Sequence, residues 1–318
     1  MDQPFFIHQK FHDFDELCCN MRNWNLDYRQ LDDGRFSSEL LMYGNSEIII
    51  GREKLGRKIR QTGESPSGLI TFGVFANPKT RIYWRGYDVS GDMLCIFPQG
   101  GELDSITHHD FDVFPISISE EILNQKCKLL GLPEINILIN NSEVLRCNPH
   151  KLSELRFWLL SIYQQLITIS AKNRNARYLK QIEQGLIDRL LKILAEDRQP
   201  ISIKPPRKRD KALFAAENYI AEHCNTDITI PELCLVANVS ERTLEYAFRE
   251  RYNLTPQSYL IMHRMNNVRK QLRTANPTKG TILKIAQLHG FLHMGQFTSD
   301  YKRIFSELPS ETLKAPNS

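Results

Sequence analysis

The spacing of apolar residues divides the chain into a strand-like part and a helical part. From Tyr28 to Ser117, short runs rich in Ile, Val, Phe and Tyr are separated by Gly, Pro, Asn and Asp turns, which is typical of β-strands. The predicted strands are Phe36–Tyr43, Glu47–Leu55, Leu69–Phe75, Arg81–Val89, Asp92–Phe97 and Phe111–Ile118. Short strands at this regular spacing predict a small barrel or sandwich.

Beyond this region the apolar residues recur at every third or fourth position, as they do in amphipathic helices. Ser119 is a predicted N-cap of a helix that ends near Gly131, and Asn148-Pro149 opens a longer helix that runs to about Ile169. The other predicted helices are Phe14–Trp24, Asn175–Asp197, Lys211–His223 and a helix from Pro256 to about Thr274.

The C-terminal segment Ile228–Leu313 contains an internal repeat with a register of 53 residues. Leu244-x3-Phe248 recurs as Phe297-x3-Tyr301, and each copy predicts a short helix, a turn and a second helix. In a helix-turn-helix unit the second helix enters a DNA major groove. Two such units on one chain predict a protein that reads two successive grooves.

Further residues at fixed places in the repeat carry a family resemblance. They are Val239-Ser240 before Leu244 and Phe248, and Gly290-Phe291 before Phe297, Phe305 and Pro309. This pairing resembles the AraC/XylS family of bacterial transcription regulators. The chain departs from the family in two places, because Ser306 stands where Gly is usual and Cys234 stands where Ala is usual.

Segments from both halves of the chain also resemble one subgroup of this family. The run GFLHMGQFTSDYKRIFSELPSETL is similar to a subgroup of the family that includes the ethanolamine-operon regulators. The N-terminal segments that look like that subgroup are Tyr28–Leu31, Gly34–Phe36, Arg52-Glu53 and Arg60-Gln61.

Together, pattern and resemblance predict an α+β protein. We expect an N-terminal β-rich, cupin-like barrel with a helical dimerisation segment over residues 1–198, and a linker over residues 199–210. An all-α DNA-binding domain with two helix-turn-helix units is expected over residues 211–318. The resemblance implies that a small-molecule effector binds the N-terminal domain.

The outward positions of the two predicted recognition helices hold the candidate DNA-binding residues. They are Arg242, Thr243, Glu245 and Tyr246 in the first helix, and Gln296, Thr298, Ser299, Lys302 and Arg303 in the second. Arg pairs with guanine, Gln with adenine and Glu with the cytosine amino group, while Thr meets the thymine methyl group. Lys302 and Arg303 are expected on phosphates, which position a protein without reading sequence. Because Gly295 offers no side chain, we expect weaker base discrimination from the second helix.

The charge distribution fits this placement. Residues 201–318 carry 17 Lys/Arg and 11 Asp/Glu, a net charge of +6, whereas residues 1–200 carry 24 and 26, a net charge of −2. Basic side chains bind DNA phosphates by releasing condensed counterions. The seven cysteines show no framework spacing, and no apolar run is long enough for a membrane span, so a cytoplasmic protein is expected.

No catalytic motif stands out, and the chain is expected to be neither an enzyme nor a cofactor protein. His289 and His293 are four residues apart, but Gly290 breaks the helix between them, so we predict no metal site. Arg81, Tyr83, Trp84 and Arg85 share one predicted strand, where they either line an effector pocket or form core and rim.

The sequence therefore predicts a cytoplasmic, sequence-specific transcription regulator controlled by a small effector. Activation is the commoner mode in the families that it resembles. The expected partners are double-stranded DNA, RNA polymerase, the effector and a second copy of the chain, with no membrane. Two alternatives remain open: a chemical sensor that reacts through Cys18 and Cys19, and a constitutive DNA-binding protein whose barrel only dimerises.

Overall fold

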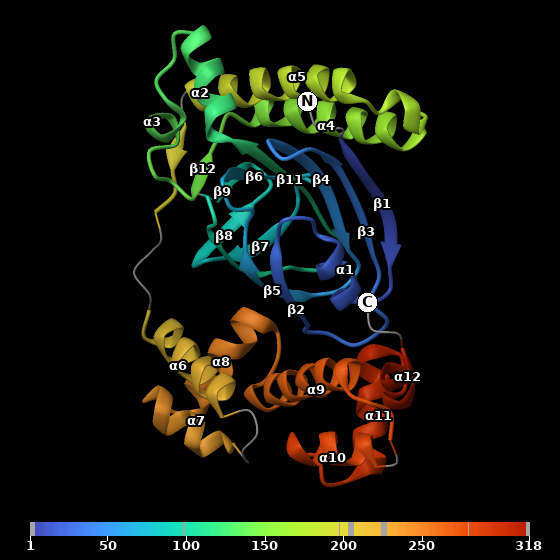
Figure 1. Cartoon of the computed structure of the whole chain (residues 1–318). Coiled ribbons are helices and arrows are strands. Elements are labelled where there is room, and N and C mark those ends of the chain that lie inside the picture. Colours follow the sequence, from blue (N-terminus) through green and yellow to red (C-terminus); the bar gives the residue numbers. More distant parts are fainter. Residues whose placement is uncertain are drawn as a thin grey trace. The chain divides into compact units, whose positions relative to one another are not determined.

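The chain forms two compact units in the computed structural model, which describes residues 4–97, 99–196, 198–202, 207–223, 228–278 and 280–315. The first unit comprises Met1–Tyr28 and Phe36–Ile203, and the second comprises Arg29–Arg35 and Lys204–Ser318 (Figure 1). The second unit thus includes a short segment from the N-terminal part of the sequence. Residues 203–206 of the predicted linker lie outside the described residues, as does Asp197 at the end of a predicted helix.

The first unit is built on two antiparallel sheets. The larger sheet has the order β1 (Phe5–Phe11), β3 (Ser38–Gly44), β4 (Ile48–Leu55), β11 (Phe111–Ser119), β6 (Leu69–Phe75), β9 (Met93–Phe97), β12 (Val144–Arg146) and β13 (Gln199–Pro200). The smaller sheet has the order β2 (Asn25–Gln30), β5 (Ile59–Glu64), β10 (Glu102–Ile106), β7 (Arg81–Trp84) and β8 (Tyr87–Ser90).

The six predicted strands all appear, although one of them is a hairpin. The predicted strand Arg81–Val89 is divided into β7 and β8 by Arg85 and Gly86, which have φ angles of 45° and 91°. Two consecutive residues with positive φ form the tight turn that suits the twist of a two-residue hairpin. The sequence did not predict β1, β2, β5, β10, β12 or β13.

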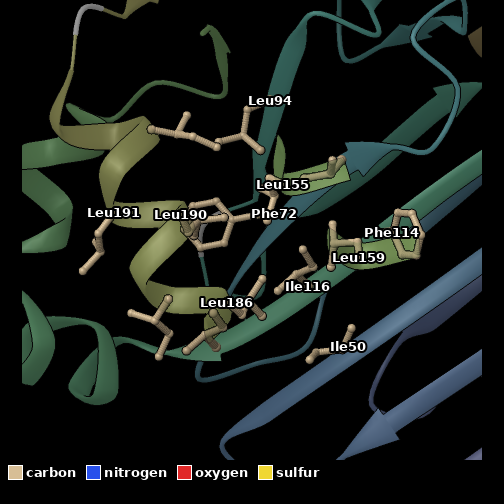
Figure 2. Close-up of a cluster of buried hydrophobic side chains, with 14 of the residues drawn as sticks. Ile50, Phe72, Leu94, Phe114, Ile116, Leu155, Leu159, Leu186, Leu190 and Leu191 are labelled. Atoms are coloured by element: carbon tan, nitrogen blue, oxygen red, sulfur yellow. The ribbon is translucent and has the colours of Figure 1, made fainter. Parts of the chain in front are cut away.

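Helices cover the larger sheet and close its hydrophobic core (Figure 2). They are α2 (Glu120–Leu129), α3 (Ile135–Ile139), α4 (Pro149–Thr168) and α5 (Ala176–Ala195). Leu155 and Leu159 of α4 and Leu190 of α5 belong to one buried cluster with Phe72 and Ile116 of the sheet. Burying each such side chain contributes about 1.5–3 kcal/mol. The remaining helix of this unit, α1 (Phe14–Asn20), is shorter than the predicted Phe14–Trp24.

The helices of the second unit follow the predicted repeat. They are α6 (Lys208–Glu222), α7 (Ile230–Ala237), α8 (Glu241–Tyr252), α9 (Pro256–Thr274), α10 (Thr281–Leu288), α11 (Met294–Phe305) and α12 (Pro309–Lys314). α8 and α11 are each 12 residues long, and both of their ends are separated by the predicted 53 residues. The predicted α+β class, with an antiparallel β-sheet domain, a helical segment and an all-α C-terminal domain, is confirmed.

Candidate nucleic-acid interface and enclosed cavity

The first helix-turn-helix unit consists of α7, a tight turn and α8. Thr229 and Glu232 form a capping box at the start of α7, so that two backbone N–H groups of its first turn are satisfied. α7 ends at Asn238, whose φ of 50° turns the chain sharply. Ser240 then caps α8 by accepting a hydrogen bond from the Thr243 backbone N–H at 3.4 Å. These local signals fix the angle at which α8 leaves the turn.

The second helix-turn-helix unit repeats this plan with α10 and α11. Here Gly290, at a φ of +81°, makes the turn, and a Cβ atom added to it would lie 3.3 Å from the Arg264 guanidinium. His289 is buried beside this turn and its Nε2 lies 2.9 Å from Gln271 Oε1. The buried faces of both recognition helices carry the predicted apolar stripes, which are Leu244, Ala247 and Phe248 in α8, and Phe297, Tyr301 and Phe305 in α11.

The structure places the predicted reading residues of α8 on or near its surface, but in different states. Arg242 is exposed and makes no hydrogen bond or ion pair with the part of the chain that the structure describes. Tyr246 is 57% exposed and its ring lies 5.1 Å from the Arg209 guanidinium. Thr243 binds the hydroxyl of the cap residue Ser240, and Glu245 is held by Arg249 at 2.8 Å. Arg242 is therefore the side chain of α8 that is most available to a ligand.

The predicted residues of α11 show a similar division. Ser299 and Lys302 are exposed, and neither makes a polar contact within the described ranges. Gln296 donates a hydrogen bond to Asp300, and Thr298 donates one to the Met294 carbonyl. These two side chains have to release or share a bond before they can contact a base.

Arg303 is held by two carboxylates within the second unit. It pairs with Asp300, one turn earlier on α11, and with Asp33 of the segment Arg29–Arg35. Because both partners are acidic, a phosphate that binds Arg303 has to compete with them. The sequence repeat could not indicate this pairing, since Asp33 lies 270 residues away.

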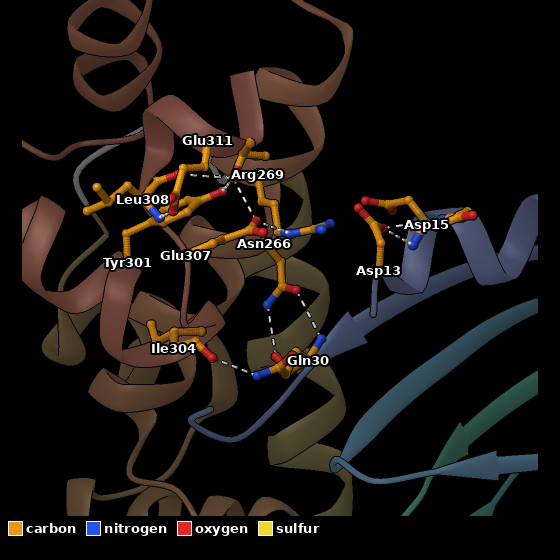
Figure 3. A network of polar contacts seen from close by, with 12 residues as sticks. Asp13, Asp15, Gln30, Asn266, Arg269, Tyr301, Ile304, Glu307, Leu308 and Glu311 are labelled. Atoms are coloured by element: carbon orange, nitrogen blue, oxygen red, sulfur yellow. Dashed lines mark hydrogen bonds and ion pairs between the residues drawn. The ribbon is translucent and has the colours of Figure 1, made fainter. Parts of the chain in front are cut away.

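The segment Arg29–Arg35 satisfies backbone groups at the end of α11 (Figure 3). The last four carbonyl groups of a helix have no partner within the helix. One of these, the Ile304 carbonyl, accepts hydrogen bonds from the Gln30 side chain at 2.7 Å and from the Gly34 backbone N–H at 2.9 Å. The segment thereby stabilises the C-terminal end of the second predicted recognition helix.

Asn266 of α9 also binds the segment Arg29–Arg35, through the backbone of Gln30. Its Oδ1 accepts from the Gln30 backbone N–H, and its Nδ2 donates to the Gln30 carbonyl, both at 2.9 Å (Figure 3). A third bond runs from Nδ2 to the Met262 carbonyl at 2.8 Å. Since Gln30 is fully buried, Asn266 is the residue that satisfies its backbone.

Both recognition helices end at a residue in the left-handed region. The two residues are Asn253, with a φ of 54°, and Ser306, with a φ of 57°. Glycine adopts this conformation freely and asparagine tolerates it, but serine does so at a cost. Of these two helix ends, only the end of α11, at Ser306, therefore carries a strained residue.

Replacing Ser306 with glycine is expected to stabilise the second unit by about 1 kcal/mol, because it relieves this backbone strain. Urea unfolding followed by far-UV circular dichroism measures the change. Asn253→Gly is the matched control and should give a smaller gain. An equal effect of the two substitutions would show that Ser306 is not strained.

The first unit encloses a cavity between its two sheets, of about 60 Å³. The larger sheet contributes Glu53, Gly73, Phe75, Cys95, Phe97, Phe111, Val113 and Pro115, and the smaller sheet contributes Tyr28, Gln61, Ile82, Trp84, Leu103 and Ser105. Met21 and Trp24 complete the lining. Of the strand Arg81–Trp84, Ile82 and Trp84 line this cavity, whereas Arg81 is exposed.

Burial determines the state of the cysteine considered as a chemical sensor. Burial, aided by nearby Asp15 and Glu53, raises the pKa of the Cys18 thiol far above its ordinary value of 9.0. A thiol with a raised pKa stays protonated and reacts slowly, because the thiolate is the nucleophile. Cys19 is exposed. The structure therefore gives Cys18 no support as a reactive sensor.

None of the helices in the described ranges is both long and apolar enough to cross a membrane.

Comparison with known proteins places the C-terminal unit in a family. Residues 233–315 match a family model described as a helix-turn-helix domain. A probable thc operon regulatory protein of Rhodococcus erythropolis is 35% identical over 99 residues, which are 31% of this chain and 30% of that protein. The XylDLEGF operon transcriptional activator of Pseudomonas putida is 23% identical over 245 residues, which are 74% of this chain and 72% of that protein.

Among solved structures, the AraC-like transcriptional activator CuxR is similar with a TM-score of 0.43 and 16% identity, over 82% of this chain and 93% of that one. The match to the Rhodococcus protein is confined to the C-terminal part, where the helix-turn-helix repeat lies, and spans less than a third of that protein. The prediction that the chain is a regulator and not an enzyme is confirmed. Residues 233–315 thus form a helix-turn-helix domain, and the proteins that the chain resembles there are transcription regulators.

Proposed function

We propose that the protein binds specific DNA sites through α8 and α11 and activates transcription in response to a small effector. The observation that carries this proposal is the exact repeat of the two recognition helices, each preceded by a short helix and a tight turn. A basic residue recurs at the same spacing, since Arg249 of α8 and Lys302 of α11 are 53 residues apart. A protein with two equivalent readers is suited to two successive major grooves, ~34 Å apart on one face of DNA.

Within this proposal the reading residues have different roles. Arg242 and Tyr246 read bases, with Thr243 and Glu245 beside them in α8. In α11, Gln296, Thr298 and Ser299 contact base edges or phosphates, while Lys302 and Arg303 hold the phosphate backbone. The exposed, unengaged state of Arg242 and Lys302 supports their assignment most strongly.

Replacing Arg242 with alanine is expected to weaken binding to the cognate site by about 1–3 kcal/mol and to relax the preference at one base pair, because a bidentate contact with guanine is lost. Competition binding against a library that varies each position of the site measures both effects. Equal weakening on cognate and random DNA would mean that Arg242 contacts phosphate.

Replacing Lys302 with alanine is expected to weaken binding to all sequences alike, because a phosphate contact carries no sequence information. The slope of log K against log salt should become less steep by about one, since one counterion fewer is released. Titrations at several salt concentrations measure this slope, with Arg242→Ala as the matched variant. A sequence-dependent loss would instead assign Lys302 to a base.

The first unit supplies the regulatory input in this proposal. Its cavity holds the effector, and residues 1–198, 199–210 and 211–318 act as sensing domain, linker and DNA-binding domain. Dimerisation through the outer face of α4 is supported by Phe157, which is 73% exposed. Analytical ultracentrifugation tests it: Phe157→Glu should give monomers if this face joins two copies.

The last part of the proposal concerns the activation of transcription and the operon that is regulated. The Pseudomonas putida relative is named as an activator, which supports contact with RNA polymerase by this chain too. Such a regulator acts in the cytoplasm, where bacterial DNA lies. Membership of the ethanolamine-operon subgroup is supported by the quoted C-terminal run and by the segments around Tyr28, Glu53 and Gln61. Genome-wide selection of bound DNA fragments tests this context, because the enriched operon identifies the regulated genes.

A further inference from the structure

The start of α6 contacts the exposed face of the first recognition helix. α6 packs against α8 within the second unit (Figure 1). Arg209, the second residue of α6, lies over the ring of Tyr246, with 5.1 Å between the guanidinium carbon and the ring centroid. A second contact joins Arg209 to α8 one turn later, where its Nη2 donates to Glu250 Oε1 at 2.8 Å. Arg209 therefore spans Tyr246 and Glu250, which share one face of α8 because they are four residues apart.

Neighbouring charges hold Arg209 itself in a fixed orientation. Its partner Glu250 is also contacted by Arg207, at 3.3 Å, and Arg207 in turn pairs with Asp210 at 2.9 Å. The side chain of Arg209 is only 27% exposed, and its Nε is buried. Rotamer freedom that folding has already removed is not lost a second time on binding. The cation over Tyr246 is thus an ordered part of the second unit.

The Tyr246 side chain is supported at its ring but open at its tip. The residue is largely exposed, and its hydroxyl makes no hydrogen bond with the part of the chain that the structure describes. A tyrosine on a helix surface otherwise samples more than one χ1 rotamer, and ordering it on binding costs free energy. A guanidinium over the ring favours one orientation, because the face of an aromatic ring attracts cations. From that orientation the hydroxyl can donate or accept a hydrogen bond.

The contact with α6 distinguishes Tyr246 from the other candidate readers of α8 that have a partner. Thr243 binds its cap residue, and Glu245 is held by Arg249 of the same helix. Among the described residues, Tyr246 is the candidate reader of α8 that another helix contacts. Arg209 lies in the segment 199–210 that the sequence predicts as a linker, so no sequence pattern indicated this contact.

We propose that Arg209 positions the Tyr246 ring for base readout, and thereby determines specificity at the base pair that Tyr246 contacts. Arg209 is a positioning residue, because it acts through Tyr246 and not on the DNA itself. Arginine suits this role because its planar guanidinium stacks on an aromatic ring while its N–H groups pair with a carboxylate. A lysine keeps the charge but has no planar group that makes both contacts. This inference rests on the proposed function, since it adds a residue of α6 to the reading surface of α8.

Binding of the full chain to a library that varies each position of the selected DNA site tests the proposal. Tyr246→Ala identifies the base pair that Tyr246 reads, as the position at which the preference is lost. Arg209→Ala should weaken the preference at this base pair by about two- to fivefold, the worth of an exposed cation–π contact, and leave the other positions unchanged. Arg209→Lys should restore little of the preference. Glu250→Gln, which removes the ion pair that holds Arg209, should give a smaller loss at the same base pair.

Three controls separate positioning from a general effect on charge or stability. Arg207→Ala removes the other cation that pairs with Glu250, but Arg207 contacts no aromatic ring among the described residues, so the preference should be retained. Adding Arg209→Ala to Tyr246→Ala should change the preference at this base pair no further, because Arg209 acts through Tyr246. The slope of log K against log salt should be the same for Arg209→Ala and the unmodified protein, since no phosphate contact is lost.

Two results for Arg209→Ala would overturn the proposal and leave the proposed function standing. The first is an equal loss at every position, with a shallower salt slope and rescue by lysine, because it would assign Arg209 to a phosphate. The second is a preference that does not change at the base pair read by Tyr246. Failure of the proposed function looks different: the unmodified protein would then select no specific DNA fragment, and this inference would fall with it.

Discussion

Replacing Asn266 with alanine is expected to destabilise the second unit by about 3 kcal/mol. The substitution removes three hydrogen bonds and leaves the backbone N–H and carbonyl of Gln30 without their partner in a fully buried position. Each buried polar group that loses its partner costs about 1–3 kcal/mol. The segment Arg29–Arg35 should then detach from α9, and the end of α11 should lose the two hydrogen bonds that it receives at Ile304.

The measurement uses the uneven distribution of tryptophan. All three tryptophans, Trp24, Trp84 and Trp158, belong to the first unit, whereas helices are the regular elements of the second unit in the ranges described, apart from its N-terminal segment. Asn266→Ala should shift the far-UV circular dichroism transition in urea much more than the fluorescence transition. Asn267→Ala, on the neighbouring position of α9, is the control. Equal shifts for the two variants would contradict the role given to Asn266.

Replacing Glu53 with glutamine is expected to stabilise the first unit at pH 8 but not at pH 4. Burial, partly offset by hydrogen bonds from Tyr28 and Gln61, raises the pKa of Glu53 from 4.5 to about 7. Because the folded pKa lies above the unfolded one, the native state binds more protons between these two values. Its stability therefore falls as pH rises from 4.5 to 7, and the loss is complete above pH 7. The shift corresponds to on the order of 3 kcal/mol.

Urea unfolding followed by tryptophan fluorescence from pH 4 to pH 8 tests this expectation. The difference in unfolding free energy between Glu53→Gln and the unmodified protein should grow across the window from 4.5 to 7. Glu102→Gln, which changes an exposed carboxyl, should show no such growth. A difference that stays constant with pH would mean that burial does not disfavour the ionised form of the Glu53 carboxyl group.

Chain connectivity offers a route from the cavity to the DNA-binding unit. Tyr28, which donates to Glu53, is followed directly by Arg29, the first residue of the segment that binds α9 and α11. Under the proposed function, an effector that changed the position of Tyr28 would act on the backbone of this segment. Regulation then follows if the ligand favours one state of the segment over another.

Local signals made the helical part of the chain predictable. Ser119, Pro149, Ser240 and Pro256 mark helix starts that the structure bears out, and the 53-residue register reproduces both ends of α8 and α11. Capping and helical periodicity act within a few residues, so they can be read directly from the sequence. The start of α6 was placed three residues too late, at Lys211, because Lys208–Asp210 resembled the charged linker.

Long-range contacts limited the prediction of the cavity and of the Arg29–Arg35 segment. β5 and β10 carry polar residues such as Gln61 and Ser105 on their inward face, so their strand pattern was weak. Nothing near Gln30 in the sequence indicates Asn266, 236 residues away. The segments compared with the ethanolamine-operon regulators contained Tyr28, Gln30, Glu53 and Gln61, which was the available signal for both sites.

Footprinting of the purified protein on its best selected DNA fragment tests the central claim most directly. Two helix-turn-helix units on one chain predict two protected major-groove segments on one face of the DNA, about one helical turn apart. Arg242→Ala should weaken protection of one segment and leave the other. A single protected groove, or protection that is the same on random DNA, would contradict the account of two sequence readers.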